Sequence, residues 1–175
     1  MSRKQRLSAD DWLHAGLQAL AASGPEALKA EPLARALDTT KGSFYWHFED
    51  VPRYRQALLN FWHDISGKLP SRPSEKSEAV AQLHAIIRDG FGGDTATEAA
   101  MRSWAATDPD AAAAIADLDK RRLEHLTGLL RQLGVTNPDL SLSLYAAKVG
   151  MAALSEDRRD DKALDSLVDL VLALR

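Results

Sequence analysis

The chain has 175 residues, of which 45% are hydrophobic and 27% are charged, and its formal net charge is −3. This composition is typical of a globular protein of one or two domains. The absence of cysteine excludes disulfides and thiolate metal sites. We see no apolar leader at the N-terminus and no run of roughly 18 apolar residues that would span a membrane, so a cytoplasmic location is expected.

The N-terminal third reads as three helices, because its apolar residues recur at helical spacing and no strand alternation is visible. Ser8 or Asp10 is placed to cap a first helix that runs to about residue 22 and ends at the Gly24-Pro25 step. A short second helix is expected over about 30–37. A third follows Thr40 and ends near residue 48.

The remainder also reads as helices. Asp50 is placed to cap a fourth helix with an apolar stripe at Tyr54, Leu58, Phe61 and Ile65. The segment 67–77, "GKLPSRPSEKS", has the composition of a linker. Five further helices are predicted at about 78–91, 95–107, 109–133, 138–154 and 161–174. Asp108 and Asn137 stand before prolines at two of their starts, which is a typical helix beginning.

The stretch "DTTKGSFYWHFED", residues 38–50, divides by face. Phe44 and Phe48 are four residues apart and face the interior, whereas Lys41, Tyr45 and Trp46 lie on the other side. Thr40 at the helix start would leave backbone N–H groups suited to a phosphate, and Gly42 costs a helix about 1 kcal/mol unless another backbone must come close. The pattern predicts a helix-turn-helix; a generic three-helix bundle is the alternative. Trp46 could instead pack on the fourth helix, and His47 could be a capping or surface histidine.

The sequence "LARALDTTKGSFYWHF" resembles the DNA-binding signature of the tetracycline-repressor (TetR) family of bacterial transcription regulators. Ala34 and the run from Thr40 to Phe48 carry the likeness. The resemblance implies an all-α fold. Residues 1–49 would form a three-helix DNA-binding bundle with a helix-turn-helix, which helix four joins to a larger helical domain for ligand sensing and dimerisation over 50–175. The DNA-binding residues it implies are Thr40, Lys41, Gly42, Ser43, Tyr45, Trp46 and His47.

Within that set, Thr40, Tyr45 and His47 are expected on phosphates, and Lys41, Ser43 and Trp46 on base edges. Two positions depart from the family pattern. Asp38 occupies a turn position that is usually glycine, and aspartate tolerates left-handed backbone better than most residues. Val51 stands where a phosphate-binding lysine is usual, so that Arg53 or Arg55 replaces it or the contact is lost. Further phosphate candidates are Lys29, Arg35, Arg3, Lys4 and Arg6.

The last two helices have wide apolar faces suited to a four-helix interface between two copies. The residues predicted there are Leu140, Leu144, Ala147, Gly150, Met151, Leu154, Leu164, Leu167, Val168 and Val171. Ordinary packing within one chain is the alternative.

Aromatic, sulfur and polar side chains on the inner helices predict a ligand pocket. The candidates are Phe61, Trp62, Phe91, Met101, Trp104, Arg122, His125 and Leu126. An ordinary core is the alternative, since rings at helical spacing are usually core. No metal or cofactor is expected, because His63, His84 and His125 lie on separate helices without a short ligand motif.

Taken with the resemblance, these features predict a homodimeric transcriptional regulator, usually a repressor, that binds an inverted-repeat DNA operator and is released by a small molecule. The alternative is a DNA-binding dimer whose C-terminal domain only dimerises or docks a protein partner. No catalytic motif is present, so enzymatic activity and a membrane role are not expected.

Overall fold

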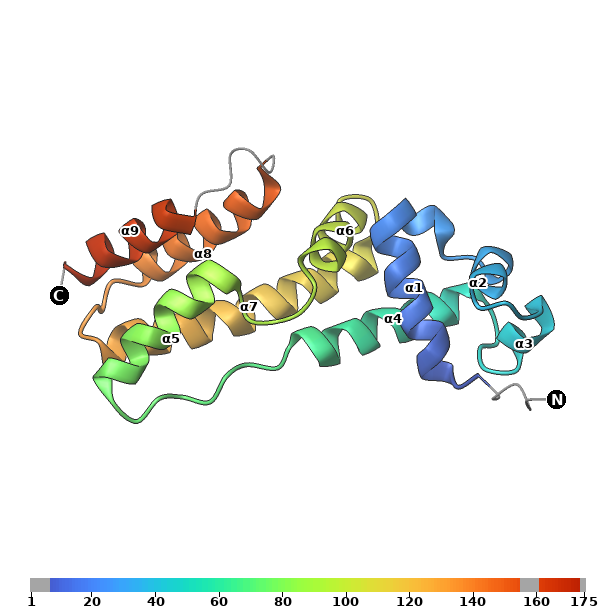
Figure 1. The fold of residues 1–175 in the computed structure, drawn as a ribbon, viewed down its shortest axis with the longest axis horizontal. Coiled ribbons are helices and arrows are strands. Elements are labelled where there is room, and N and C mark those ends of the chain that lie inside the picture. The colour runs from blue at the N-terminus through green and yellow to red at the C-terminus, as the bar shows by residue number, and fades with distance from the viewer. Residues whose placement is uncertain (1–6, 155–160, 174–175) are drawn as a thin grey trace. The chain divides into compact units, whose positions relative to one another are not determined.

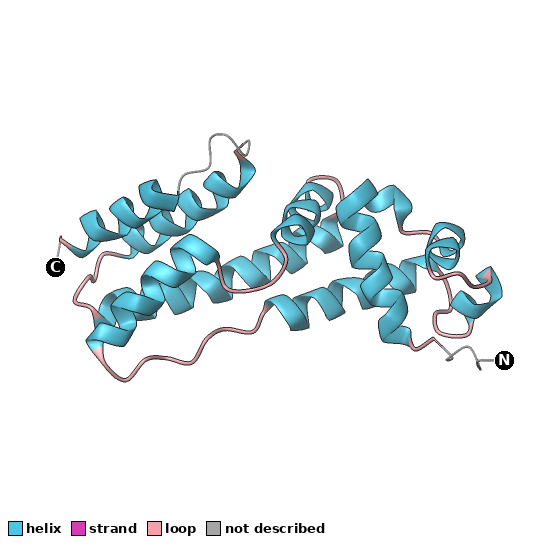
Figure 2. Ribbon diagram, in the orientation of Figure 1, coloured by secondary structure: helices cyan, strands magenta, loops and turns pink. Residues whose placement is uncertain are grey.

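The computed structural model describes residues 7–154 and 161–173, and within them every regular element is a helix (Figures 1 and 2). The predicted all-α fold class is confirmed. In chain order the elements are α1 (Ala9–Ser23), the 3-10 turn η1 (Pro25–Ala27), α2 (Ala30–Ala36), α3 (Lys41–Tyr45), α4 (Val51–Ser66), α5 (Lys76–Asp89), α6 (Thr95–Ala105), α7 (Pro109–Gln132), α8 (Pro138–Ala153) and α9 (Asp161–Leu172). None of these described helices has the length and apolarity needed to cross a membrane.

The helices pack into two compact units. Unit 1 comprises Met1–Ile65 and Asp94–Ile115, and unit 2 comprises Ser66–Gly93 and Ala116–Arg175. Helix α7 therefore contributes its first turns to unit 1 and the remainder to unit 2. The predicted domain boundary between residues 49 and 50 does not coincide with the boundary of either packing unit, and it stays a prediction.

Unit 1 is built around a close crossing of α1 and α4 (Figure 1). The Tyr54 hydroxyl donates to the Trp12 carbonyl at 2.9 Å, and both side chains are fully buried. This crossing requires glycine at position 16, because a Cβ atom there would overlap the Tyr54 hydroxyl. Helix α1 also packs against α2 and α6. The crossing thus fixes α4 to the first helix of the unit.

Polar side chains set the helix starts as predicted. The Asp11 amide donates to Ser8 Oγ at 3.2 Å, and the Arg53 amide donates to Asp50 Oδ1 at 2.7 Å. Asp108 and Asn137 accept from backbone amides at 3.0 Å at the starts of α7 and α8. Thr40 occupies the N-cap position of α3, as expected, and its side chain makes no capping hydrogen bond.

Two expectations need correction. On α4 the buried stripe continues through Trp62, which is 1% exposed, whereas Phe61 is half-buried and Ile65 is 41% exposed. Steps of four residues from Tyr54 lead through Leu58 to Trp62, whereas Phe61 and Ile65 lie on the neighbouring face of the helix. Helix α5 ends at Asp89 because Gly90 adopts φ +87°, and Phe91 therefore lies in a loop instead of on the helix.

Unit 2 packs α5, α8 and α9 against one another. His84 on α5 joins α9, with its Nδ1 3.1 Å from Asp165 Oδ1 and its Nε2 3.3 Å from Asp169 Oδ1. The carboxylates lie at opposite ring nitrogens, so the three side chains do not converge on one ion. No group of His, Asp or Glu in the described part of the chain is arranged to hold a metal.

Candidate functional site

The turn between α2 and α3 forms without the glycine that the TetR pattern carries. Asp38 adopts φ +48° and is the one described residue other than glycine with a positive φ. The Thr39 amide then donates to the Ala34 carbonyl at 2.9 Å, which closes the end of α2. Aspartate is among the few residues that reach this left-handed region at modest cost. The turn is therefore preserved, as expected from the sequence.

Helix α3 is anchored by Phe44, which is fully buried. Its ring centroid lies 5.4 Å from that of Trp12, 5.3 Å from Phe48 and 5.1 Å from Tyr54. Aromatic rings at these spacings contribute packing beyond their buried area. One face of the "DTTKGSFYWHFED" stretch is thus core, and it holds α3 against α1 and α4.

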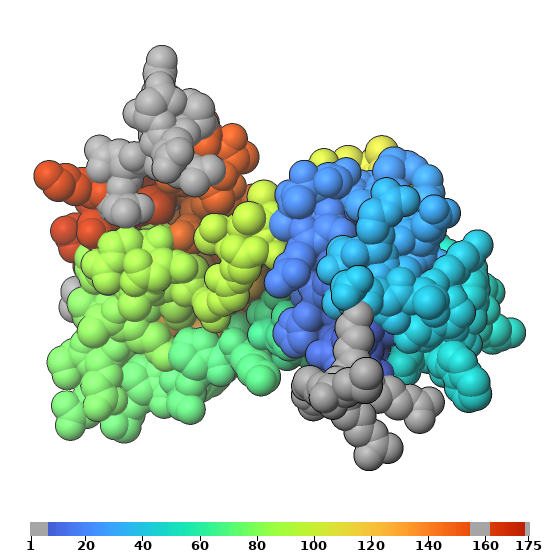
Figure 3. All heavy atoms as spheres, turned by 45° about the vertical axis from the view of Figure 1, so that its right-hand side comes forward, coloured from blue at the N-terminus to red at the C-terminus, as the bar shows by residue number. Residues whose placement is uncertain are grey.

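The opposite face of α3 is exposed to solvent, and α2 and α3 lie on the outer surface of unit 1 (Figure 3). Trp46 is 79% exposed and Tyr45 is 47% exposed, which rules out the alternative in which Trp46 packs on α4. Lys41 Nζ lies 5.9 Å from the Tyr45 ring centroid. A Cβ atom at Gly42 would meet only Thr40 Oγ1, at 3.7 Å. The structure therefore leaves open space above Gly42.

Ser43 and His47 are half-buried at the margins of this face. The His47 ring packs beside Phe48 with a centroid distance of 6.3 Å. All seven predicted DNA-binding residues therefore lie in one segment of unit 1, with five exposed and these two at its edge. Their contact with DNA stays a prediction.

The cations around this face differ in what they contact. Arg55 is turned inward, where its Nη2 donates to the Pro25 carbonyl at 3.3 Å, whereas Arg53 is exposed in the first turn of α4. Arg53 is therefore the more accessible of the two arginines beside Val51, and its contact with phosphate stays a prediction. Lys29 forms an exposed ion pair with Glu26 at 3.1 Å, and Arg35 forms one with Glu31 at 3.4 Å. Exposed ion pairs contribute little to stability, so both cations can exchange these partners for phosphate. Arg3, Lys4 and Arg6 lie outside the described residues.

The predicted ligand-pocket residues divide between the two units. Unit 1 holds Phe61, Trp62, Met101 and Trp104, and unit 2 holds Phe91, Arg122, His125 and Leu126. Trp62, Met101, Trp104 and Leu126 are at most 2% exposed and belong to the cores of their units. A single pocket formed by all eight stays a prediction. Arg122 and His125 both contact Phe91.

In unit 2, the buried polar side chains of Arg122 and His125 lie against the half-buried Phe91 ring. The Arg122 guanidinium carbon lies 5.2 Å from the Phe91 ring centroid, and the His125 and Phe91 ring centroids are 6.1 Å apart. Burial, together with the charge of Arg72, lowers the pKa of His125. Tyr145, which the sequence did not single out, adds a hydroxyl that donates to Asp119 Oδ1 at 2.6 Å. Burial first, and then this hydrogen bond, raise the pKa of Tyr145 to about 12.

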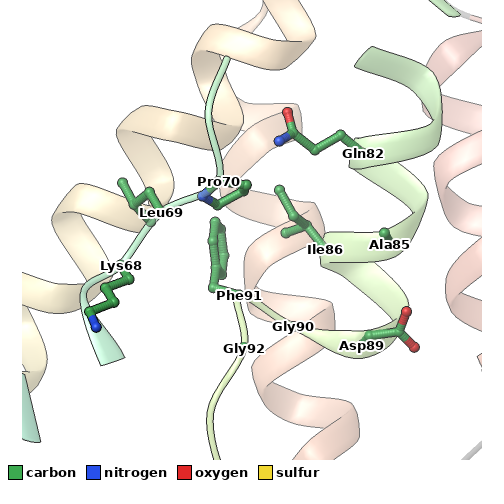
Figure 4. Close-up of a pocket in the computed structure, with 10 residues that line it drawn as sticks. All are labelled: Lys68, Leu69, Pro70, Gln82, Ala85, Ile86, Asp89, Gly90, Phe91 and Gly92. Atoms are coloured by element: carbon green, nitrogen blue, oxygen red, sulfur yellow. The ribbon is translucent and has the colours of Figure 1, made fainter. Parts of the chain in front are cut away.

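A hollow of about 490 Å³ adjoins Phe91 (Figure 4). Its walls come from the segment after α4, the C-terminal half of α5 and the loop that follows. The lining residues are Lys68, Leu69, Pro70, Gln82, Ala85, Ile86, Asp89, Gly90, Phe91 and Gly92. The Phe91 ring points toward Pro70, whereas the Lys68 ammonium and the Asp89 carboxylate point away from the ring (Figure 4). The surface beside the ring is therefore apolar.

The predicted dimer residues also divide. Leu144, Leu164, Val168 and Val171 are at most 3% exposed within the single chain, so they belong to the core of unit 2 and the within-chain alternative is correct for them. Leu140, Ala147, Met151 and Leu167 are half-buried, while Gly150 and Leu154 are exposed. The sequence missed Leu142 and Leu170, which are 54% and 62% exposed. For Leu142 the sequence does offer a signal, because it shares a face of α8 with the small residues Ala146, Gly150 and Ala153, and all four are exposed.

A short helix, a tight turn and a second helix with an exposed polar-aromatic face define a helix-turn-helix DNA-binding domain. Residues 13–50 match the family described as bacterial regulatory proteins, tetR family. Residues 13–50 thus carry a TetR-type DNA-binding domain, which supports a DNA-binding transcriptional regulator.

Solved structures share the fold over nearly the whole chain. A putative TetR-family regulator from Rhodococcus sp. is 20% identical with a TM-score of 0.70, and the match covers 94% of this chain and 98% of that one. Escherichia coli NemR in its reduced form is 16% identical with a TM-score of 0.68 and coverage of 93% and 95%. Salmonella enterica GusR is 16% identical with a TM-score of 0.66 and coverage of 97% and 98%. No curated protein sequence shows significant similarity to the chain.

Proposed function

We propose that the protein is a homodimeric transcriptional repressor that binds an inverted-repeat operator through α3 and is released from it by a small molecule. The observation that carries the DNA-binding surface is the division of α3 into a buried anchor, Phe44, and an exposed face with Lys41, Tyr45 and Trp46. Such a rigidly held face is suited to enter the major groove.

The exposed side chains differ in what they offer to DNA. Lys41 donates to guanine O6 or N7, and the Trp46 ring meets a thymine methyl, so these two, with Ser43, read bases. Tyr45, Thr40 and His47 contact phosphates and fix the register of the helix without specifying sequence. The open space above Gly42 lets the DNA backbone approach.

One α3 helix reaches only a few base pairs, so tight specific binding requires two copies. Helices α8 and α9 offer the exposed apolar surface for such pairing, with Leu142 and Leu170 as its largest side chains. The strip of Ala146, Gly150 and Ala153 on α8 allows close approach of a second helix, because nothing within 4 Å crowds a Cβ placed at Gly150. A four-helix interface follows from two such pairs.

Ligand response would act through helices that continue from one unit to the other. Helix α7 has residues 109–115 in unit 1 and its remainder in unit 2, and α4 ends where unit 2 begins. A ligand that favours one arrangement of unit 2 would bias α4 and change the separation of the two α3 helices. Ligand and operator then oppose each other through a coupling free energy, typically 1–3 kcal/mol.

Selection of duplexes by the full-length protein, from DNA upstream of its own gene and from a random library, tests the DNA role. The expected product is an inverted repeat with half-site centres roughly 34–36 Å, or about one helical turn, apart or at a multiple of that spacing. Recovery of unpaired half-sites, or of no preferred sequence, would contradict the proposal. An operator affinity that no compound stabilising the protein ever alters would favour the alternative of a domain for dimerisation or protein docking.

A further inference from the structure

A hollow of about 390 Å³ lies between α2, α3 and the first residue of α4, all of them within unit 1. We call it the α2–α3 hollow. Its charged and hydroxyl groups come from Lys29 at the N-cap of α2, Glu31 and Arg35 on α2, and Lys41 and Tyr45 on α3. Three cations against one carboxylate give the hollow an excess of positive charge, although the whole chain has a net charge of −3.

The ion pairs of Lys29 with Glu26 and of Arg35 with Glu31 compete only weakly with a stronger anion. Each of these four side chains is more than half exposed, so water screens the attraction within both pairs. Only one of the two carboxylates, that of Glu31, lines the hollow. A phosphate group offers the ammonium and the guanidinium charge-assisted bonds, and it can accept two parallel bonds from the arginine. The hollow is therefore suited to an oxyanion.

The position of the hollow within the helix-turn-helix indicates where that oxyanion comes from. In this motif the second helix enters the major groove, and the first helix crosses the DNA backbone. A space between the two helices therefore faces a strand at the edge of the groove. Lys41 and Tyr45 are exposed on α3 and belong both to this space and to the proposed reading face. A backbone phosphate would meet the cations of α2 there.

Val51 is the residue of α4 that lines the hollow. It stands where the TetR pattern usually has a phosphate-binding lysine. Arg53 and Arg55 do not line the hollow, and Arg55 instead donates to the Pro25 carbonyl at 3.3 Å. The positive charge beside Val51 is thus supplied by α2 and α3 and not by α4.

We propose that the α2–α3 hollow binds one phosphate of the DNA backbone in each half-site, through Lys29, Arg35 and the Tyr45 hydroxyl. This contact takes the place of the one that a lysine at position 51 would make. The inference rests on the proposed function and adds to it a phosphate site built on α2. Since a phosphate carries no sequence information, the site raises affinity and fixes register without selecting bases.

Fluorescence anisotropy of the full-length protein at several salt concentrations tests the proposal, with the selected duplex and a scrambled duplex of equal length. A Lys29→Ala, Arg35→Ala double variant should bind both duplexes about tenfold more weakly at a given salt concentration. The plot of log affinity against log salt should become shallower by about 2 for the dimer, because each phosphate contact contributes about 0.9. A double variant with the wild-type slope would overturn the proposal.

The matched control is a Lys120→Ala, Arg131→Ala double variant. Both residues are exposed on α7 in unit 2, which contains no part of α2 or α3, and the variant removes the same charge from the chain. Its affinity and its salt slope should equal those of the wild type. An equal loss in this control would assign the effect to net charge alone and would contradict a local site.

Single phosphates of the selected duplex, replaced by uncharged methylphosphonates, identify the contact. One replacement in each half-site should weaken the wild type and leave the Lys29→Ala, Arg35→Ala variant unaffected, since its partners are already absent. Replacements that weaken both proteins equally at every position would contradict the proposal. Loss of the response in Arg53→Ala, with the response retained in the double variant, would place the phosphate on α4 instead.

Two substitutions should strengthen binding, which a merely structural role would not produce. Glu31→Gln removes the carboxylate of the hollow and its pair with Arg35, so the affinity for both duplexes should rise. Val51→Lys, added to the Lys29→Ala, Arg35→Ala variant, should restore affinity and salt slope, because position 51 lines the same hollow. Thermal midpoints verify folding, and Glu31→Gln serves alone where the double variant does not fold. Unchanged or weaker binding in these variants would overturn the site.

The scrambled duplex separates this inference from the proposed regulatory function. A wild type that binds both duplexes equally, while the double variant loses salt slope on both, supports the phosphate site and contradicts sequence-specific regulation. A wild type that prefers the selected duplex, while the double variant keeps the wild-type slope, supports the regulator and overturns the phosphate site. Absence of binding to any duplex contradicts both.

Discussion

Replacing Gly42 by alanine should stabilise the protein and weaken its binding to DNA at the same time. The added methyl would meet only Thr40 Oγ1, at 3.7 Å, so it fits the folded chain without strain. Alanine favours a helix interior by about 1 kcal/mol over glycine. Because α3 has only five residues and Gly42 is its second, we expect about half of that, which raises the thermal midpoint by ~1–2 °C.

The same methyl points into the space through which the DNA backbone is proposed to approach. Overpacking at a close contact typically costs about 1–3 kcal/mol, so the affinity for the selected duplex should fall about tenfold or more. Fluorescence anisotropy at fixed salt measures this, since salt alone alters such affinities strongly. Ser103→Ala, on the exposed face of α6, is the control: it should stabilise a helix to a similar degree and leave DNA affinity unchanged. Wild-type or tighter binding by Gly42→Ala would refute the close approach at this position.

Three further substitutions test other parts of the structure. Gly16→Ala should lower the free energy of unfolding by about 2 kcal/mol in urea, because its methyl displaces the buried Tyr54 hydroxyl and outweighs the gain in helix propensity; an unchanged midpoint would contradict the close crossing. Since burial lowers the pKa of His125, the folded state resists its protonation, and stability should decline as pH falls below about 6.5. His125→Gln should remove that part of the decline when the free energy of unfolding is measured by urea titration at several pH values. An equal decline with pH in the wild type and the variant would contradict this role of His125. Leu170→Glu, at a site 62% exposed, should convert a dimer into monomers in analytical ultracentrifugation with wild-type helicity, and a persistent dimer would move the interface elsewhere.

Local chemistry made most of the fold predictable from the sequence. Ser8, Asp50, Asp108 and Asn137 cap helices where expected, because an N-cap oxygen acts on amides two or three residues away. The spacing of four between Phe44 and Phe48 separated the buried face of α3 from the exposed one. These features depend on neighbours in the chain, which a sequence displays directly.

Features that depend on distant partners were less accessible. Trp62 and not Phe61 is fully buried on α4, and two large rings at adjacent positions fit the sequence pattern equally well. Leu144 and Val168 satisfied the pattern of a dimer face, yet the chain itself buries them. Tyr145 meets Asp119 across 26 residues, and no local pattern announces that bond. The sequence predicted Phe91, Arg122 and His125 as separate pocket candidates, but it did not predict that Arg122 and His125 contact Phe91.

The most direct test of the central claim is the binding of a Lys41→Ala, Tyr45→Ala double variant to the selected duplex in a gel shift. Both side chains lie on the exposed face of α3, and the contacts they lose are the 5.9 Å cation–π contact and the 5.2 Å ring contact of Tyr45 with Phe44, which should cost about 1 kcal/mol of stability. We predict that the shift disappears while helicity and cooperative unfolding are retained. A folded double variant that shifts the duplex at wild-type concentrations would contradict the assignment of α3 as the DNA-reading helix.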